Sequence, residues 1–134
     1  MEPKLFTLTF VFFTIVSFAQ SQTSKTDIIQ QKLVSENTIY QLFPTKNYWT
    51  FIKLDTRNGK MWQVHFAIKE GDEEGELVLN SLSLVSKEKE VNGRFTLYPT
   101  ENMYNFLLLD QIDGDVYQVQ WSFEEKYRGV VPIK

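Results

Sequence analysis

The sequence predicts an all-β protein made of two tandem antiparallel meander repeats, with about eight strands in total. Two observations support this prediction. Residues 40–70 align without a gap on residues 95–125, with identical residues at eleven of the thirty-one positions. Both copies also consist of short apolar segments separated by tight-turn residues. The repeats are expected to form one domain, as a pseudo-twofold sandwich or a small barrel. Two packed blade-like sheets rank lower, because two blades cannot close a ring.

The amino-terminal segment has the features of a cleaved secretory signal. Residues 5–18 carry no charge, and Ser17 and Ala19 place small residues at the spacing that signal peptidase requires. This stretch is shorter than a membrane span, which needs about 20 apolar residues. The predicted division of the chain is a signal peptide (1–19), a leader segment (20–36), β-repeat 1 (37–80), a connecting loop (81–91) and β-repeat 2 (92–134). Within the leader, residues 27–34 fit a short helix or a strand equally well.

The composition excludes several classes of protein. There is no cysteine, so neither a lipid anchor on a mature amino-terminal cysteine nor a disulfide is possible. No second apolar run is long enough to cross a membrane. The formal net charge of −3, with both signs mixed along the chain, argues against nucleic-acid binding, which usually needs a basic stripe. We therefore expect an exported protein, periplasmic or extracellular, that is not lipid-anchored.

Each copy is predicted to contain four strands, of which the first three are joined by two tight turns. The first turn has the sequence Pro-Thr-x-Asn, in which proline presets φ and asparagine tolerates a left-handed backbone. The second turn contains Asn58-Gly59 in copy one and Asp113-Gly114 in copy two, which is a strong hairpin signal. The expected strands are 39–43, 48–54, 61–68 and 76–79 in copy one, and 94–98, 103–109, 116–123 and 128–133 in copy two.

The third strand of each copy alternates between large apolar and mainly polar residues. In copy one, Trp62, Val64 and Phe66 alternate with Gln63 and His65. In copy two, the large set is Tyr117, Val119, Trp121 and Phe123, which alternate with Gln118 and Gln120. Successive side chains of a strand point to opposite faces, so the aromatic set is predicted to face the core and the glutamine set to face outward or into a polar groove. The second strands are apolar on both faces, as expected of central strands that are covered on both sides.

A resemblance adds a setting but no activity. The segment Tyr98–Asp110, followed by Gln118–Trp121, resembles a repeat of small uncharacterised exported bacterial proteins, and residues 55–64 look like the same repeat. The resemblance covers most of the chain after the predicted signal peptide. It implies a bacterial protein that works outside the cytoplasm, and it brings no functional residue with it.

One polar feature is shared by both copies without an evident packing reason. Gln63 and Gln118 occupy the same repeat position on the face predicted to lie away from the aromatic core. Ordinary solvent exposure is the simpler explanation, since outward strand residues are commonly polar. The functional alternative is a ligand- or partner-binding strip, because planar rings beside amide side chains suit sugars and protein partners. The residues of this strip would be Gln63, His65, Gln118, Gln120, Trp49 and Tyr104.

No catalytic residue, metal ligand or cofactor is predicted. His65 is the only histidine, and no serine or cysteine nucleophile motif accompanies it. Asp55 and Asp110 occupy the same repeat position beside a turn, so turn capping explains them better than a pair of catalytic carboxylates. The acidic run from Asp110 to Asp115 suggests calcium, but its spacing departs from that of an EF-hand loop and copy one has Lys60 opposite Asp115.

The sequence therefore predicts a non-enzymatic exported protein that binds another molecule. A protein partner, as for an inhibitor or an immunity-type factor, ranks slightly above a glycan, for which the chain would be a carbohydrate-binding module. Two further classes stay open. One is an extracytoplasmic hydrolase using Asp55 or Asp110, which needs an open cleft and a carboxyl group with a raised pKa. The other is a structural or assembly component that pairs through exposed strand edges.

Overall fold

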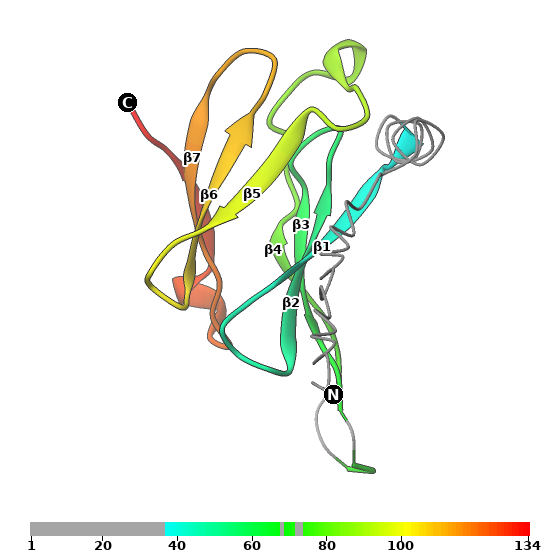
Figure 1. Cartoon of the computed structure of the whole chain (residues 1–134), viewed down its shortest axis with the longest axis vertical. Helices are drawn as coiled ribbons and strands as arrows, with labels where there is room; N and C mark the ends of the chain where they lie inside the picture. The colour runs from blue at the N-terminus through cyan, green and yellow to red at the C-terminus, as the bar shows by residue number, and fades with distance from the viewer. Residues whose placement is uncertain (1–36, 68, 72–73) are drawn as a thin grey trace, which may run out of the picture.

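The described part of the chain folds into two four-stranded antiparallel sheets, in which each strand pairs with the next strand of the same sheet (Figure 1). This computed structural model describes residues 37–67, 69–71 and 74–134; the predicted signal peptide and leader lie outside them. The strands are β1 (Tyr40–Pro44), β2 (Thr50–Asp55), β3 (Met61–His65) and β4 (Gly75–Asn80) in sheet one, and β5 (Phe95–Pro99), β6 (Asn105–Asp110), β7 (Val116–Gln120) and β8 (Gly129–Pro132) in sheet two. The all-β class and the two meanders are confirmed, and the sheets do not close into a barrel.

Outside the sheets, the described part of the chain has only short elements. Two 3-10 helices, η1 (Lys87–Lys89) and η2 (Glu125–Tyr127), lie in the connections before β5 and before β8. No helix in the described part of the chain is long and apolar enough to cross a membrane. The sheets and their packing therefore determine the shape of the described part.

The second turns of the two copies are built alike, at positions 55 residues apart. The Gly59 N–H donates to the Asp55 carbonyl oxygen at 3.0 Å, and the Gly114 N–H donates to the Asp110 carbonyl oxygen at 2.9 Å. Both glycines have a positive φ, 79° and 80°, which other residues adopt only with strain. Gly59 is also crowded, since a Cβ there would lie 2.7 Å from Leu84 Cδ1. The repeat is thus one of structure as well as of sequence.

The two copies bury opposite faces of their third strands. In sheet two the prediction is confirmed: Val119 and Trp121 are fully buried, whereas Gln118 is exposed. In sheet one the prediction is wrong, because Gln63 is fully buried while Phe66, just after β3, is 40% exposed. The alternation in the sequence is the same in both copies, so the packing of the two sheets decides which face is buried.

The central strands show the same difference. β2 buries Ile52 and Leu54 in the core, whereas the equivalent residues of β6, Leu107 and Leu109, face away from sheet one. If a twofold axis related the two copies, equivalent residues would be buried in both. Here the buried face of sheet one is equivalent to the outer face of sheet two, so the sheets pack face to back. The outer faces are only partly covered by described residues, contrary to the expectation of covered central strands. The core consists of Ile52, Leu54, Met61, Leu79, Phe95, Leu97, Phe106, Leu108, Val119 and Trp121.

Hydrogen bonds join the sheets outside this apolar core. Thr56 directly follows β2 and is buried. Its carbonyl oxygen accepts the Phe95 N–H at 2.7 Å, and its hydroxyl oxygen accepts the Gly93 N–H at 2.9 Å. The side-chain oxygen of Gln63 accepts the Ser122 N–H at 3.1 Å. The start of β5 is therefore anchored on the second turn of copy one, and β3 is anchored on the segment that follows β7.

Candidate functional site

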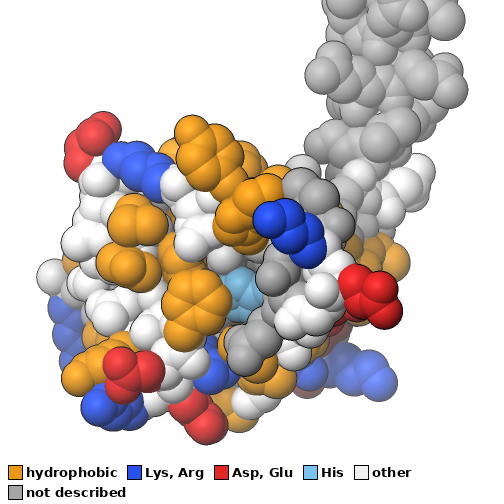
Figure 2. All heavy atoms as spheres, turned by 90° about the horizontal axis from the view of Figure 1, so that it is seen from below, with side chains coloured by type: hydrophobic (Ala, Val, Ile, Leu, Met, Phe, Trp, Pro, Cys, Tyr) orange, Lys and Arg blue, Asp and Glu red, His pale blue; other side chains and the backbone are white. Residues whose placement is uncertain are grey.

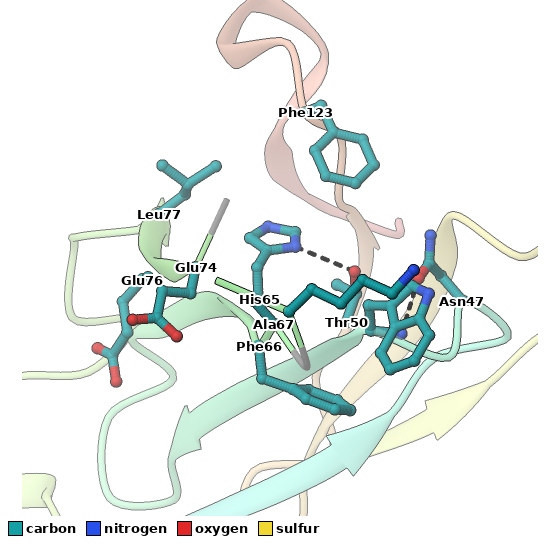
Figure 3. A pocket seen from close by; sticks show the side chains of 12 residues that line it. Asn47, Thr50, His65, Phe66, Ala67, Glu74, Glu76, Leu77 and Phe123 are labelled. Carbon is teal, nitrogen blue, oxygen red and sulfur yellow. Dashed lines mark hydrogen bonds between the residues drawn. The ribbon is translucent and has the colours of Figure 1, made fainter. Parts of the chain in front are cut away.

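A pocket of about 600 Å³ lies at one end of sheet one, beside the segment that follows β7. Figure 2 shows the histidine in a hollow between hydrophobic side chains. In Figure 3, His65 points toward Phe123, and Phe66 points away from both. The lining combines aromatic, polar and charged side chains, among them Trp49, Phe66, Phe123, Asn47, Thr50, His65, Lys69, Glu74 and Glu76.

Hydrogen bonds to both ring nitrogens hold His65 in one orientation. Its Nδ1 lies 3.0 Å from the Thr50 hydroxyl oxygen, and its Nε2 lies 3.3 Å from Gln63 Nε2. Because Gln63 Oε1 already accepts the Ser122 N–H, the Gln63 amide nitrogen faces the ring and donates to it. These directions assign the ring proton to Nδ1, which donates to Thr50. The lone pair of Nε2 is thus occupied, and the ring is not placed to act as a general base.

The aromatic side chains form two walls of the pocket. Trp49, 49% exposed, and Phe66, 40% exposed, meet edge to face, with ring centroids 5.4 Å apart and planes at 68°. Phe123, also exposed, lies over the His65 ring, with centroids 4.9 Å apart and planes at 30°. Rings that remain exposed in this way offer apolar area to a ligand. Their angles make a corner, which fits a compact apolar group better than a flat one.

Several polar groups of the pocket are engaged by the protein itself. Asn47 Oδ1 accepts the N–H of Trp49 at 2.9 Å and thereby holds the first turn. Glu76 forms an ion pair with Lys53 on the neighbouring part of sheet one. Thr50 is fully buried beside His65. The arrangement therefore offers apolar contact with a polar rim, and the hydroxyl beside His65, that of Thr50, is buried and accepts the ring proton.

The predicted strip is only partly assembled in sheet one. Trp49 and His65 line the pocket, as the sequence suggested for a ligand-facing pair. Gln63 does not face outward: it is fully buried and connects His65 to the backbone of Ser122. The packing reason that the sequence did not show is therefore a hydrogen bond between the two sheets.

The other three predicted residues lie elsewhere. Gln118 is exposed on the outer face of sheet two, and Gln120 is half-buried on the same face. Tyr104 packs against Trp121, with ring centroids 5.1 Å apart. Since sheet two turns its glutamine face away from sheet one, the structure does not bring the six predicted residues into one groove.

Two aromatic residues of the pocket were missed by sequence reasoning. Phe66 and the ring at position 123 were assigned to the core because they belong to the aromatic set of the third strands. Both are exposed and line the pocket. The sequence contains no signal for this, since Phe66 and the buried Trp121 occupy equivalent repeat positions.

The turn carboxylates cap their turns, as predicted. Asp55 Oδ1 accepts the Arg57 N–H at 3.0 Å, and Asp110 Oδ1 accepts the N–H groups of Ile112 and Asp113 at 2.9 and 3.1 Å. Burial alone would raise the pKa of both carboxyl groups. The hydrogen bonds and charge of a neighbouring arginine, together with these N–H groups, outweigh burial, so both pKa values lie below the ordinary value. This gives no support to a hydrolase that needs a carboxyl group with a raised pKa.

The Arg94 side chain lies within the acidic turn of copy two, the segment that suggested a calcium site. Its Nη2 donates to Asp110 at 2.8 Å and to Asp113 at 2.6 Å, and its Nε donates to Asp110 as well. The side chains of Arg94 and Asp110 are 3% and 2% exposed. A calcium ion would have to displace this guanidinium. In residues 37–67, 69–71 and 74–134, no group of three His, Asp or Glu side chains is placed to hold a metal ion.

Replacing His65 with glutamine, the residue at the equivalent position of copy two, tests the His65 network. We expect the fold to persist with a free energy of unfolding lower by about 1 kcal/mol, because the contact with Phe123 and the bond to Thr50 are lost. The matched control is Gln120→His, expected to change stability by less than about 0.5 kcal/mol. Urea denaturation measures both, and equal losses would contradict a specific role for His65.

The pocket is thus a corner of exposed rings above a hydrogen-bonded histidine, positioned where sheet one meets the segment after β7. Its chemistry suits contact with apolar groups more than bond making or breaking. A scan against protein-family models finds no match, and searches of curated proteins and of solved structures find none either.

Proposed function

We propose that the chain is a non-enzymatic binding protein whose pocket holds an apolar side chain of a protein partner. The observation that carries the proposal is the corner formed by Trp49 and Phe66, two rings that stay 49% and 40% exposed at the wall of a pocket of about 600 Å³. Burying such rings is favourable, and they lose little side-chain entropy on binding. Binding and not catalysis also agrees with the occupied lone pair of His65 and the lowered pKa of Asp55 and Asp110.

A peptide side chain fits this pocket better than a sugar. Sugar hydroxyls need unoccupied hydrogen-bonding groups, because an unpaired polar group costs free energy when it is buried. Among the polar groups that line the pocket, the side-chain oxygen of Asn47, the Thr50 hydroxyl and both ring nitrogens of His65 are engaged within the protein. The Trp49 and Phe66 rings meet at 68° and so do not form one flat platform for a pyranose ring.

The proposed setting is outside the bacterial cytoplasm. The uncharged stretch 5–18 and the small residues Ser17 and Ala19 support export through a cleaved signal. The resemblance of the repeat to that of small exported bacterial proteins supports the same setting. An exported protein with a rigid β scaffold and a side-chain pocket is suited to act as an inhibitor or immunity-type factor against another exported protein.

Selection of linear peptides from a displayed library tests the pocket directly. We expect the purified chain to retain peptides with an aromatic or large aliphatic residue. Trp49→Ala should weaken their binding by at least about tenfold, because a buried ring at an interface commonly contributes more than about 1.4 kcal/mol. The matched control is Tyr104→Ala, which removes a ring at the equivalent position of copy two, outside the pocket, and should leave the affinity unchanged.

Three outcomes would count against the proposal. The library could yield no peptide above background, or the selected peptides could bind both variants equally. A panel of oligosaccharides that binds the chain in a Trp49-dependent manner, with no such peptide, would instead indicate a carbohydrate-binding module. Calorimetry and thermal melts of both variants separate lost binding from lost fold.

A further inference from the structure

Each sheet has one face in the core and one face that the described residues leave partly uncovered. The uncovered side of sheet one, face one, is formed by Tyr40, Leu42, Phe51, Trp62 and Val64. The uncovered side of sheet two, face two, is formed by Tyr98, Leu107, Leu109, Gln118 and Val131. All of these side chains are exposed or half-buried. Apolar faces of this kind indicate interaction surfaces.

Face two repeats the residues that sheet one uses inside the molecule. Leu107 and Leu109 stand at the repeat positions of Ile52 and Leu54, which are fully buried against sheet two. Leu107 is 38% exposed although it carries the same kind of side chain. Face two is therefore composed like a surface that already packs on another sheet in this protein.

Face one repeats the residues that sheet two uses on the other side of the same interface. Leu42 and Phe51 stand at the repeat positions of Leu97 and Phe106, both buried in the core. Lys53 departs from this pattern, since a leucine stands at the equivalent position of copy two. Its Nζ is paired with Glu76 and lies 4.8 Å from the centre of the Trp62 ring. The charge therefore keeps these partners if a second sheet covers the aliphatic part of the lysine side chain.

Polar contacts of the internal interface have the same counterparts. Gln63 accepts the Ser122 N–H, and the equivalent residues are Gln118 on face two and Ala67 after β3. Lys46 and Glu101 occupy equivalent repeat positions and also meet across the internal interface, where Lys46 Nζ donates to the Glu101 carbonyl oxygen at 2.7 Å. A further sheet placed on face two would therefore bring its own lysine to Glu101. The charged and hydrogen-bonding groups of the internal interface therefore have repeat equivalents that would meet in the same way, as its apolar residues do.

From these matches we propose that a second copy of the chain packs on this one, with face one of one molecule on face two of the next. The contact is head to tail, because the two molecules use different surfaces, as the two sheets do within one chain. It also gives Gln118 a role: its amide oxygen would accept the Ala67 N–H of the neighbouring molecule. This inference goes beyond the pocket, since neither Leu42 nor Leu107 lines it, although Ala67 belongs both to the proposed contact and to the pocket wall.

The test blocks one face at a time. Leu42→Lys places a charge on face one, and Leu107→Lys places a charge on face two. Sedimentation equilibrium of the purified chain should show an average mass that increases with concentration above the mass of one chain. Each variant alone should stay a monomer. An equal mixture of the two variants should form dimers and nothing larger, because one intact face one and one intact face two remain. Gln118→Ala should raise the dissociation constant by about tenfold.

The controls place the same charge away from both faces. Leu82→Lys and Ile112→Lys replace exposed residues in loops and should associate like the unmodified chain. Thermal melts confirm that every variant folds. A chain that stays a monomer at all concentrations overturns the proposal. So does a mixture of the two blocked variants that fails to dimerise, or a blocked variant that dimerises alone through like faces.

Discussion

Replacing Trp121 with alanine is expected to lower the free energy of unfolding by about 4 kcal/mol, the range measured for large aromatic residues in cores. The side chain is fully buried, its indole N–H donates to the Met103 carbonyl oxygen at 2.9 Å, and its ring contacts Tyr104 and Phe123. Truncation would leave a cavity between the sheets and an unpaired carbonyl group. Urea denaturation monitored by far-UV circular dichroism measures the loss.

The matched control for Trp121 is Phe66→Ala, because the two residues occupy equivalent repeat positions. Phe66 is 40% exposed, so its truncation should lower the free energy of unfolding by only about 1 kcal/mol. A twofold arrangement of the repeats would bury both rings alike. Similar losses for the two variants would therefore contradict the face-to-back packing of the sheets.

The second large effect is expected for Asp110→Asn, which should lower the free energy of unfolding by about 3 kcal/mol, since it leaves a buried charge without its main partner. The carboxylate accepts hydrogen bonds from both Nε and Nη2 of Arg94 and caps its own turn. Asp113 still contacts Arg94 in the variant and limits the loss. The matched control is Asp55→Asn, where the arginine partner, Arg57, is one-third exposed, so a smaller loss is expected.

The same carboxylates give a pH dependence with a definite sign. The folded pKa of Asp55 and of Asp110 lies below the unfolded value of about 3.9, because the arginine contacts outweigh burial. Their contribution to stability is therefore fully present above about pH 4 and is lost as the pH falls through the folded pKa values. Urea denaturation from pH 6 down to about pH 2.5 should show this decline, and it should be shallower in Asp110→Asn. A decline of equal slope in both proteins would contradict the assignment.

The strands could be predicted from the sequence because their signals are local. Asn58-Gly59 and Asp113-Gly114 identify the second turns, and the apolar segments beside them identify the strands. The buried face could not be predicted. Gln63 and Gln118 are the same residue at equivalent repeat positions, and yet Gln63 is buried and Gln118 is exposed. A period of two separates the faces of a strand, but which face is buried depends on the packing between the sheets, which the local pattern does not contain.

The candidate site was predicted only in part for the same reason. Trp49 and His65 were identified as residues that could contact a ligand, and both line the pocket. Phe66 and Phe123 were assigned to the core, since their exposure follows from how the sheets are stacked. Arg94 was not identified, because its counterpart in copy one is Ile39 and its partner Asp110 already had a local explanation as a turn cap.

The meander order of both sheets has a consequence for how the chain folds. Every strand pairs with the strand next to it in the sequence, so all strand pairing requires only short loops to close. The hydrogen bonds that join residues furthest apart in the sequence lie between the sheets, through groups such as Thr56 and Gln63. Low contact order favours rapid pairing, and docking is then the slow step. Substitutions at Gln63 should therefore change the unfolding rate more than the folding of each hairpin.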